Sequence, residues 1–278
     1  MEPHQAAMFI NEVKCKSLLN KSGISVIDYS INPYYGCAHK CQYCYAVFMK
    51  KFTGHVEPWG DFVDAKVNAP EVLARQLTRL KKRSRISFGT VCDPYQPLEL
   101  KYQITRQCLE ILKPYRHSLS ILTKSNIVVR DIDILSKLHK LRVSFTITTM
   151  DEQVRKIFEP GAPSTEQRFK ALRTLSHSGI RTSVFVAPVL PNLSDSEKNL
   201  CGIFKMAKIH GAEYVMFDTL NPYPKVWRNI RRLVKTSFPE TIKDYDYFYT
   251  NRRMYKVRLR ERISRLANKY NLEYKFAF

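Results

Sequence analysis

The 278-residue chain lacks several features that would assign it to common classes of protein. It has no apolar run long enough to cross a membrane, and its first residues carry no signal-peptide pattern. Its seven cysteines are odd in number and clustered, unlike the cysteines of a disulfide framework. We therefore expect no membrane contact and a reducing, cytoplasmic environment.

Acidic residues are also scarce. The chain has 25 Asp and Glu residues against 46 Lys and Arg residues, which gives a formal net charge of +21 at pH 7. A field of that sign attracts polyanions, so DNA or RNA is an expected partner. The alternative is a solvated basic surface that binds nothing.

Three of the cysteines form the most informative motif of the chain. Cys37, Cys41 and Cys44 have the spacing C-x3-C-x2-C, and no fourth cysteine follows nearby. A cubane iron–sulfur cluster normally takes four cysteine ligands, so three leave one iron free to bind a substrate or cofactor. An open metal position is typical of catalysis, whereas a closed one is typical of a structural site.

Zinc is the alternative metal for these cysteines, with His39 or a distant residue as the fourth ligand. Structural zinc sites usually combine two cysteine or histidine pairs, and no second cysteine pair is present. His39 lies inside the loop, where it is poorly placed to bind the same metal. The motif therefore predicts an iron–sulfur cluster, and zinc stays open as the second reading.

The rest of the chain alternates between extended and helical patterns. The expected strands are residues 24–32, 85–91, 118–123, 142–148, 181–188 and 214–217. The expected helices are residues 70–77, 104–112, 131–138, 165–178 and 196–210. About six βα units predict an α/β fold with a parallel sheet, and six is fewer than the eight of a closed barrel. We therefore expect a partial (βα)6 barrel of the TIM type.

Three regions are expected along the chain. Residues 1–23 are a polar lead-in, residues 24–220 form the barrel, and residues 221–278 form a basic C-terminal extension. The prolines Pro222 and Pro224 mark the last boundary. Apolar spacing over residues 254–270 predicts an amphipathic helix docked on the barrel, with a basic outer face. That face is either a track for a polyanion or only a solvated surface.

Several segments beyond the cysteine motif resemble the radical S-adenosylmethionine superfamily. The resemblance is to the branch around spore photoproduct lyase, which is also called DNA repair photolyase-like, and it spans residues from about 12 to about 220. The segments are Ser30–Tyr34, Ser87–Pro97, Leu122–Ser125, Thr148–Asp151, Glu159–Pro160 and Val186–Pro191. The resemblance implies a partial barrel, a [4Fe-4S] cluster, S-adenosyl-L-methionine as cofactor and a reducing electron donor.

The resemblance also implies roles for residues of the cysteine motif. Cys37, Cys41 and Cys44 would ligate the cluster. Tyr43, next to the last ligand, would shield the cluster or contact the adenine of the cofactor. Tyr45 stands where the lyase has a tyrosine that neighbours the site and relays a hydrogen atom.

Further site residues are expected at the ends of strands. Lys124 follows an expected strand at the face where barrels hold their active sites, and its ammonium would pair with the cofactor carboxylate. Ser144 would bind the cofactor through its hydroxyl, and Gly89 and Thr90 would let the backbone approach the methionine amino group. Cys92, at a place comparable to the hydrogen-donating cysteine of the lyase, is a candidate donor of a hydrogen atom.

The expected function is therefore that of a radical enzyme. It would cleave S-adenosylmethionine reductively at the cluster to a 5′-deoxyadenosyl radical, which abstracts hydrogen from a substrate. The substrate is expected to be nucleic acid, bound through the basic extension, with lyase-like repair of a DNA lesion as the first hypothesis. Modification of a tRNA nucleoside is the second hypothesis. A zinc-stabilised, non-catalytic nucleic-acid-binding protein is the alternative from another class.

Overall fold

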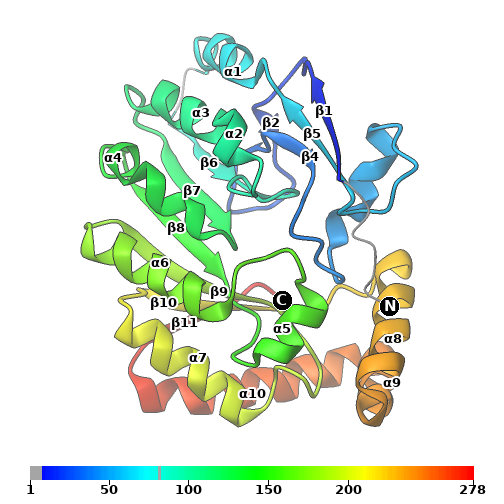
Figure 1. The fold of residues 1–278 in the computed structure, drawn as a ribbon. Helices are drawn as coiled ribbons and strands as arrows, with labels where there is room; N and C mark the ends of the chain where they lie inside the picture. Colours follow the sequence, from blue (N-terminus) through cyan, green and yellow to red (C-terminus); the bar gives the residue numbers. More distant parts are fainter. Residues whose placement is uncertain (1–7, 81–82) are drawn as a thin grey trace. The chain divides into compact units, whose positions relative to one another are not determined.

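The computed structural model describes residues 8–80 and 83–278, and the chain divides into two compact units (Figure 1). Unit 1 consists of the residues up to Lys40, Ala46–Val143 and Ser178–Ile180. Unit 2 consists of Cys41–Tyr45, Ser144–His177 and Arg181–Phe278. The division falls inside the cysteine motif, so the two halves of that motif belong to different units.

Unit 1 is built on short, mostly parallel strands. β3 (Tyr29–Ile31) pairs in parallel with β6 (Arg85–Phe88), β6 pairs in parallel with β7 (Ser118–Thr123), and β2 (Asn20–Lys21) adds an antiparallel end strand. A second, small sheet has the order β1 (Phe9–Val13), β5 (Phe62–Lys66), β4 (Tyr34–Gly36). The helices are α1 (Ala69–Leu77), α2 (Glu99–Tyr102), α3 (Ile104–Leu112) and α4 (Ile132–Leu135), with 3-10 helices η1 (Tyr45–Phe52) and η2 (Asn126–Asp131).

Unit 2 has the same α/β architecture. β9 (Arg181–Val189), β10 (Tyr214–Thr219) and β11 (Glu273–Phe276) pair in parallel, and β8 (Leu141–Thr146) lies where the two units divide. The helices are α5 (Glu152–Phe158), α6 (Thr165–His177), α7 (Glu197–Ile209), α8 (Pro224–Ser237), α9 (Ile242–Thr250) and α10 (Arg252–Tyr270), with the 3-10 helix η3 (Pro239–Thr241). Parallel strands followed by helices confirm the predicted α/β class.

Local patterns explain the elements that were predicted well. β7 alternates buried and half-buried residues, and α3 has the amphipathic spacing of a surface helix, so both occupy the expected ranges. α6 ends just before Gly179, whose φ of 76° suits a glycine after a helix C-terminus.

The first expected strand was wrong in its length. Only Tyr29–Ile31 of residues 24–32 is a strand, because Ile24 and Val26 find no sheet to cover them and are 45% and 66% exposed. The expected polar lead-in, apart from residues 1–7, which lie outside the described ranges, contains β1 and β2.

The C-terminal extension is helical, as predicted, but it also supplies a strand. β11 joins β10 in parallel, and α10 packs beside α7 (Figure 1). The rings of Phe204 in α7 and Tyr270 in α10 stack with centroids 5.9 Å apart. The ammonium of Lys208 donates to the carbonyl of Tyr270 at 2.8 Å. Within the described ranges, no helix combines the length and the apolar character that a bilayer crossing needs.

Candidate active site

The first half of the cysteine loop, Gly36–Lys40, is held within unit 1 by two buried polar side chains. The Gln96 amide accepts from the Ala38 backbone N–H at 2.9 Å, and Nε2 of His39 lies 3.1 Å from Oδ2 of Asp93. His39 and Gln96 are fully buried, while the neighbouring Cys37 is only half-buried. The residues that follow Cys37 are thus fixed in the core, and Cys37 itself stays half-buried.

Asp93 is the centre of this arrangement. Besides His39, its carboxylate accepts from the Thr123 hydroxyl at 2.7 Å, the Tyr95 N–H at 2.9 Å and the Lys124 N–H at 2.6 Å. Burial alone would raise the pKa of Asp93, but His39 and these hydrogen bonds outweigh it and hold that pKa at about 2. Asp93 therefore connects the cysteine loop to the carboxyl end of β7 as a stable anion.

The second half of the loop, Cys41–Tyr45, is held within unit 2 by a different set of groups. The Tyr43 hydroxyl donates to Glu159 and lies 3.3 Å from the Thr148 hydroxyl, and Glu159 forms an ion pair with the fully buried Arg168. Burial is the main reason that the pKa of Tyr43 is well above its ordinary value. Tyr43 therefore uses its hydroxyl to anchor the loop, while Cys41 and Cys44 on either side stay half-buried.

The C-terminal extension contacts this second half directly. The Asn229 side chain in α8 donates to the carbonyl of Gln42 at 2.9 Å and lies 3.1 Å from its side-chain oxygen. Gln42 also donates its N–H to the Phe158 carbonyl at 2.8 Å. The residue between Cys41 and Tyr43 is thus held from two directions within unit 2.

Asn32 organises the loop that follows β6 in unit 1. Its amide donates to the Thr90 hydroxyl at 2.9 Å, and its side-chain oxygen accepts from the Val91 N–H at 3.0 Å and lies 3.8 Å from the Cys92 sulfur. The buried ammonium of Lys66 donates to the Asn32 carbonyl at 2.8 Å. Cys92, the candidate hydrogen donor, is buried, with 6% of its surface exposed, and its sulfur lies beside Asn32.

The other expected site residues lie as follows. Lys124 directly follows β7, as predicted, and Gly89 follows β6 with a φ of 89°. A Cβ on Gly89 would come within 2.3 Å of the Leu122 carbonyl, so close backbone packing already requires glycine there. Ser144 lies in the middle of β8 with its hydroxyl 2.7 Å from that of Ser183, and Tyr45 is 43% exposed at the start of η1. Their roles toward a cofactor stay predictions.

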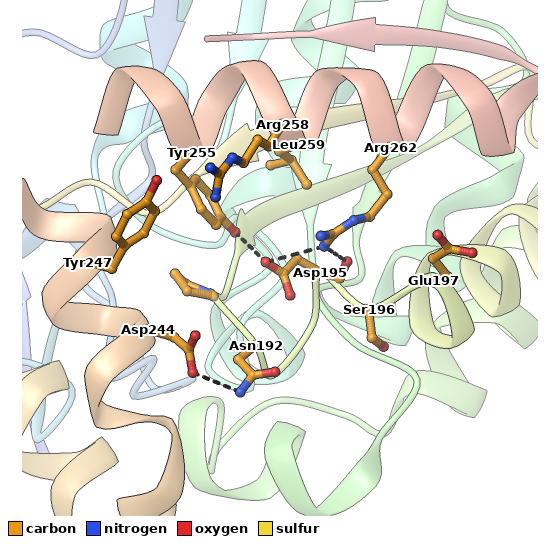
Figure 2. Close-up of a pocket in the computed structure, with 11 residues that line it drawn as sticks. Asn192, Asp195, Ser196, Glu197, Asp244, Tyr247, Tyr255, Arg258, Leu259 and Arg262 are labelled. Atoms are coloured by element: carbon orange, nitrogen blue, oxygen red, sulfur yellow. Dashed lines mark hydrogen bonds and ion pairs between the residues drawn. The ribbon is translucent and has the colours of Figure 1, made fainter. Parts of the chain in front are cut away.

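A cavity of about 410 Å³ lies elsewhere in unit 2, against α10 (Figure 2). Figure 2 shows Tyr255 and Arg262 of α10 reaching Asp195 on the loop after β9, and burial raises the pKa of Asp195. None of the site residues expected from the sequence lines this cavity. The cavity therefore lies where α10 packs against the loop after β9, and it is not part of the candidate cluster site.

Comparison with known proteins identifies the family. The sequence model of the Radical SAM superfamily matches residues 31–201, which include the cysteine loop and the strands from β4 to β9. The chain belongs to the radical SAM superfamily. An uncharacterized protein of Methanocaldococcus jannaschii is 34% identical over 232 residues, which cover 84% of this chain and 85% of that protein. A radical SAM Nalpha-GlyT isomerase of Pseudomonas phage M6 is 24% identical over 220 residues, 78% of this chain and 45% of that protein.

Solved structures of spore photoproduct lyase share the fold. The lyase complexed with dinucleoside spore photoproduct matches with a TM-score of 0.74 at 18% identity, over 97% of this chain and 82% of that one. A variant of the lyase with bound AdoMet and dinucleoside spore photoproduct matches with a TM-score of 0.73 at 18% identity, over 97% and 81% of the two chains. The predicted architecture, the partial barrel of a radical SAM protein, is thereby confirmed.

The donor set of this radical SAM protein suits a cluster. Cys37, Cys41 and Cys44 are half-buried, and of the five residues between them Ala38, His39 and Tyr43 are buried while Lys40 and Gln42 are half-buried. Thiolates are the ligands that iron–sulfur clusters take. Over residues 8–80 and 83–278, no group of three or more His, Cys, Asp or Glu side chains is close enough together to bind a metal ion. The fit therefore rests on the chemistry and exposure of the three thiols.

Sequence reasoning missed the residues that hold the loop. Asp93, Gln96 and Glu159 all stand in segments that resemble the lyase branch, but the motif alone gave them no role. Each is a polar side chain that is at most 9% exposed, and buried polar groups need partners. The sequence feature that could have identified two of them is the pair of polar residues, Asp93 and Gln96, among prolines and an aromatic residue in Asp93-Pro94-Tyr95-Gln96-Pro97.

Proposed function

We propose that this chain is a radical SAM enzyme whose [4Fe-4S] cluster is held by Cys37, Cys41 and Cys44. The cluster would supply one electron, from a reducing donor, that splits S-adenosylmethionine into methionine and a 5′-deoxyadenosyl radical. Lys124, Gly89, Thr90 and Ser144 remain the residues proposed to bind that cofactor, with Tyr43 beside the cluster. The observation that carries the proposal is the set of three half-buried cysteines in a loop that the buried residues Ala38, His39 and Tyr43 anchor, in a chain of this family.

The proposed substrate is nucleic acid, and the proposed reaction resembles that of a lyase acting on a DNA lesion. Two observations support it. The formal net charge of +21 attracts polyanions, and a structurally similar enzyme, spore photoproduct lyase, binds dinucleoside spore photoproduct. Within this proposal Cys92 is the hydrogen donor to the substrate radical and Tyr45 relays a hydrogen atom.

Product analysis tests the chemistry. Anaerobically reconstituted protein, reduced with dithionite, should convert S-adenosylmethionine to 5′-deoxyadenosine and methionine, slowly, even without a substrate. Replacing Cys37, Cys41 and Cys44 together by Ala should abolish bound iron and the product. A triple variant that still binds iron and sulfide like the wild type would overturn the ligand assignment.

The role of Lys124 has its own test, since cofactor affinity and the iron content of the cluster can be measured separately. Lys124→Ala should weaken S-adenosylmethionine binding and leave iron content unchanged. Lys156→Ala is a suitable control, because Lys156 belongs to α5 and carries no proposed role. Unchanged cofactor affinity in Lys124→Ala would remove Lys124 from the site.

The experiments should also test two alternative functions. A tRNA nucleoside is the second candidate substrate, so candidate DNA and RNA substrates should be compared under argon. A zinc-stabilised binding protein would be colourless, whereas a cluster protein is brown. The position of His39 disfavours zinc, because its Nε2 faces Asp93 in the core of unit 1.

A further inference from the structure

Lys256 and Arg260, two cations of α10, lie against aromatic rings at the end of the described chain. The Arg260 guanidinium lies 5.1 Å from the centre of the Phe276 ring and 5.0 Å from that of Phe278, and the Lys256 ammonium lies 5.5 Å from that of Phe278. The two rings meet edge to face with centroids 5.3 Å apart. We call Lys256, Arg260, Phe276 and Phe278 the aromatic–cation cluster.

These cations differ from Arg262 and Arg265 of the same helix, which are also partly or fully exposed. Arg262 and Arg265 pair with Asp195 and Glu197, and the carboxylates balance their charge. A ring attracts a cation but carries no net charge, so a cation held by rings keeps its full charge. Among the described ion pairs, none includes Lys256 or Arg260. Burial raises the pKa of the part-buried Asp218, and the charge of Lys256 lowers it by a smaller amount.

The place of the cluster in unit 2 suits contact with a substrate. Phe276 is opposite Phe217 in the β10–β11 pairing, and the Ala277 N–H donates to the Phe217 carbonyl at 2.9 Å. Since these strands are parallel, their carboxyl ends lie at one edge of the sheet. Barrel enzymes hold their active sites at that edge.

Half-exposed rings beside cations that form no described ion pair match one kind of polyanion. Phe276 and Phe278 are half-buried and Arg260 is exposed. Proteins bind single strands by stacking bases on aromatic or guanidinium planes while cations contact the phosphates. In a duplex the bases are stacked on each other, so a base reaches such a ring only from a single strand or after flipping out.

We propose that the aromatic–cation cluster binds single-stranded nucleic acid, with a base stacked on Phe278 and the adjoining phosphates at Lys256 and Arg260. The inference rests on the proposed function, which it deepens by placing one contact of the substrate. It also separates the arginines of α10 into two sets. Arg260 would contact nucleic acid, whereas Arg265 would only hold the helix against α7.

The test measures how the reconstituted full chain binds a fluorescein-labelled single-stranded oligonucleotide of roughly ten nucleotides, a length within the usual range for such sites. Phe278→Ala should weaken binding about ten-fold, because stacking on one ring is lost. Arg260→Gln should weaken binding and lower the slope of log affinity against log salt by about one, because one phosphate contact is lost. The matched control, Arg265→Gln, should bind like the wild type.

An abasic oligonucleotide of the same length separates stacking from charge. The wild type should bind it as weakly as Phe278→Ala binds the normal strand, and Phe278→Ala should bind both alike. Phe278→Trp keeps a ring for stacking and should bind like the wild type, with its tryptophan fluorescence quenched by the normal strand. The proposal is overturned if Phe278→Ala binds both strands like the wild type, or if the wild type prefers a duplex competitor.

The proposed function is tested in the same preparation by another product. Wild-type protein that forms 5′-deoxyadenosine but binds the oligonucleotide independently of Phe278 would keep the radical chemistry and overturn the cluster. Wild-type protein that binds the strand through Phe278 but forms no 5′-deoxyadenosine would keep the aromatic–cation cluster as a binding site and overturn the proposed radical chemistry.

Discussion

The two halves of the cysteine loop are held by different chemistry. Around Cys37 the anchors are a histidine facing an aspartate and the uncharged amide of Gln96. Around Cys41 and Cys44 the anchor is a tyrosine hydroxyl on a carboxylate that a buried arginine neutralises. The first anchor depends on an ionised Asp93, whereas Arg168 in the second stays charged at any ordinary pH. One loop is thus fixed by two anchors that fail under different conditions.

The largest effect should come from the second anchor. Arg168→Met would leave the buried carboxylate of Glu159 without its partner, and such a loss typically costs about 3–5 kcal/mol of unfolding free energy. Chemical denaturation monitored by circular dichroism measures it. Lys170→Met, which removes the exposed pair with Glu166 on the same helix, is the control and should cost less than about 1 kcal/mol. Equal stability of the two variants would show that Glu159 does not need Arg168.

Gly36, just before Cys37, tests the backbone beside the first anchor. Gly36 has a φ of 78°, and a Cβ there would come within 2.2 Å of the Phe62 carbonyl. Gly36→Ala should therefore cost about 3 kcal/mol, from left-handed strain plus overpacking. Gly54→Ala has a similar φ of 71° with nothing within 4 Å of its Cβ, so it should show the strain alone, about 1 kcal/mol. If both variants unfold at the same denaturant concentration, the contact with Phe62 is unimportant.

Asp93 should make the first anchor sensitive to acid. The pKa of Asp93 is about 2 in the folded chain, below the ordinary value of about 3.9. A depressed pKa stabilises the fold above the unfolded value and loses that contribution as pH falls through the folded value. Asp93→Asn should cost about 2 kcal/mol at neutral pH, and its difference from the wild type should shrink between about pH 4 and about pH 2.

The control for this titration is Asp28→Asn. The pKa of Asp28 is also lowered to about 2, by hydrogen bonds from Arg85, but the pair is exposed to solvent. Salt should therefore reduce the effect of Asp28→Asn and leave that of Asp93→Asn nearly unchanged. A pH-independent difference between the wild type and Asp93→Asn would contradict the ionised anchor.

The smallest expected effect is at the contact from the extension. Asn229→Ala removes two hydrogen bonds to Gln42 and should cost about 1 kcal/mol. Iron content after reconstitution should fall clearly although the loss of stability is small, because Gln42 lies between the proposed ligands Cys41 and Cys44. Asn268→Ala, on the exposed face of α10, should change neither quantity.

Much of the fold could be predicted from local patterns, and the limits of that prediction are physical. α3 and β7 were predicted to the residue because their periodicity lies within a few turns or pleats. β5 was missed because its pairing with β1 joins residues about fifty positions apart, as in Phe9 with Phe62. β11 was missed because its residues, Glu-Tyr-Lys-Phe, form no apolar run and become a strand only beside β10.

The candidate site, like the fold, could be predicted only where the pattern is local. Three cysteines at fixed spacing could be recognised along the chain, because neighbouring ligands need only local sequence. Their anchors could not, since His39 with Asp93 and Tyr43 with Glu159 are pairs made by folding. Cys92 was placed after the correct strand, but its burial beside Asn32 depends on β3 and β6 lying side by side.

The bond from Asn229 to Gln42 bears on how the chain can be divided for experiments. A shortened chain that ends near residue 220 would lose α8 and with it one support of the cysteine loop, and it would also leave β10 without its neighbour β11. A poor cluster in such a protein would then report lost support rather than lost substrate binding. The extension is better studied by single substitutions on its surface, because its interior packs in the same compact unit as Cys41 and Cys44.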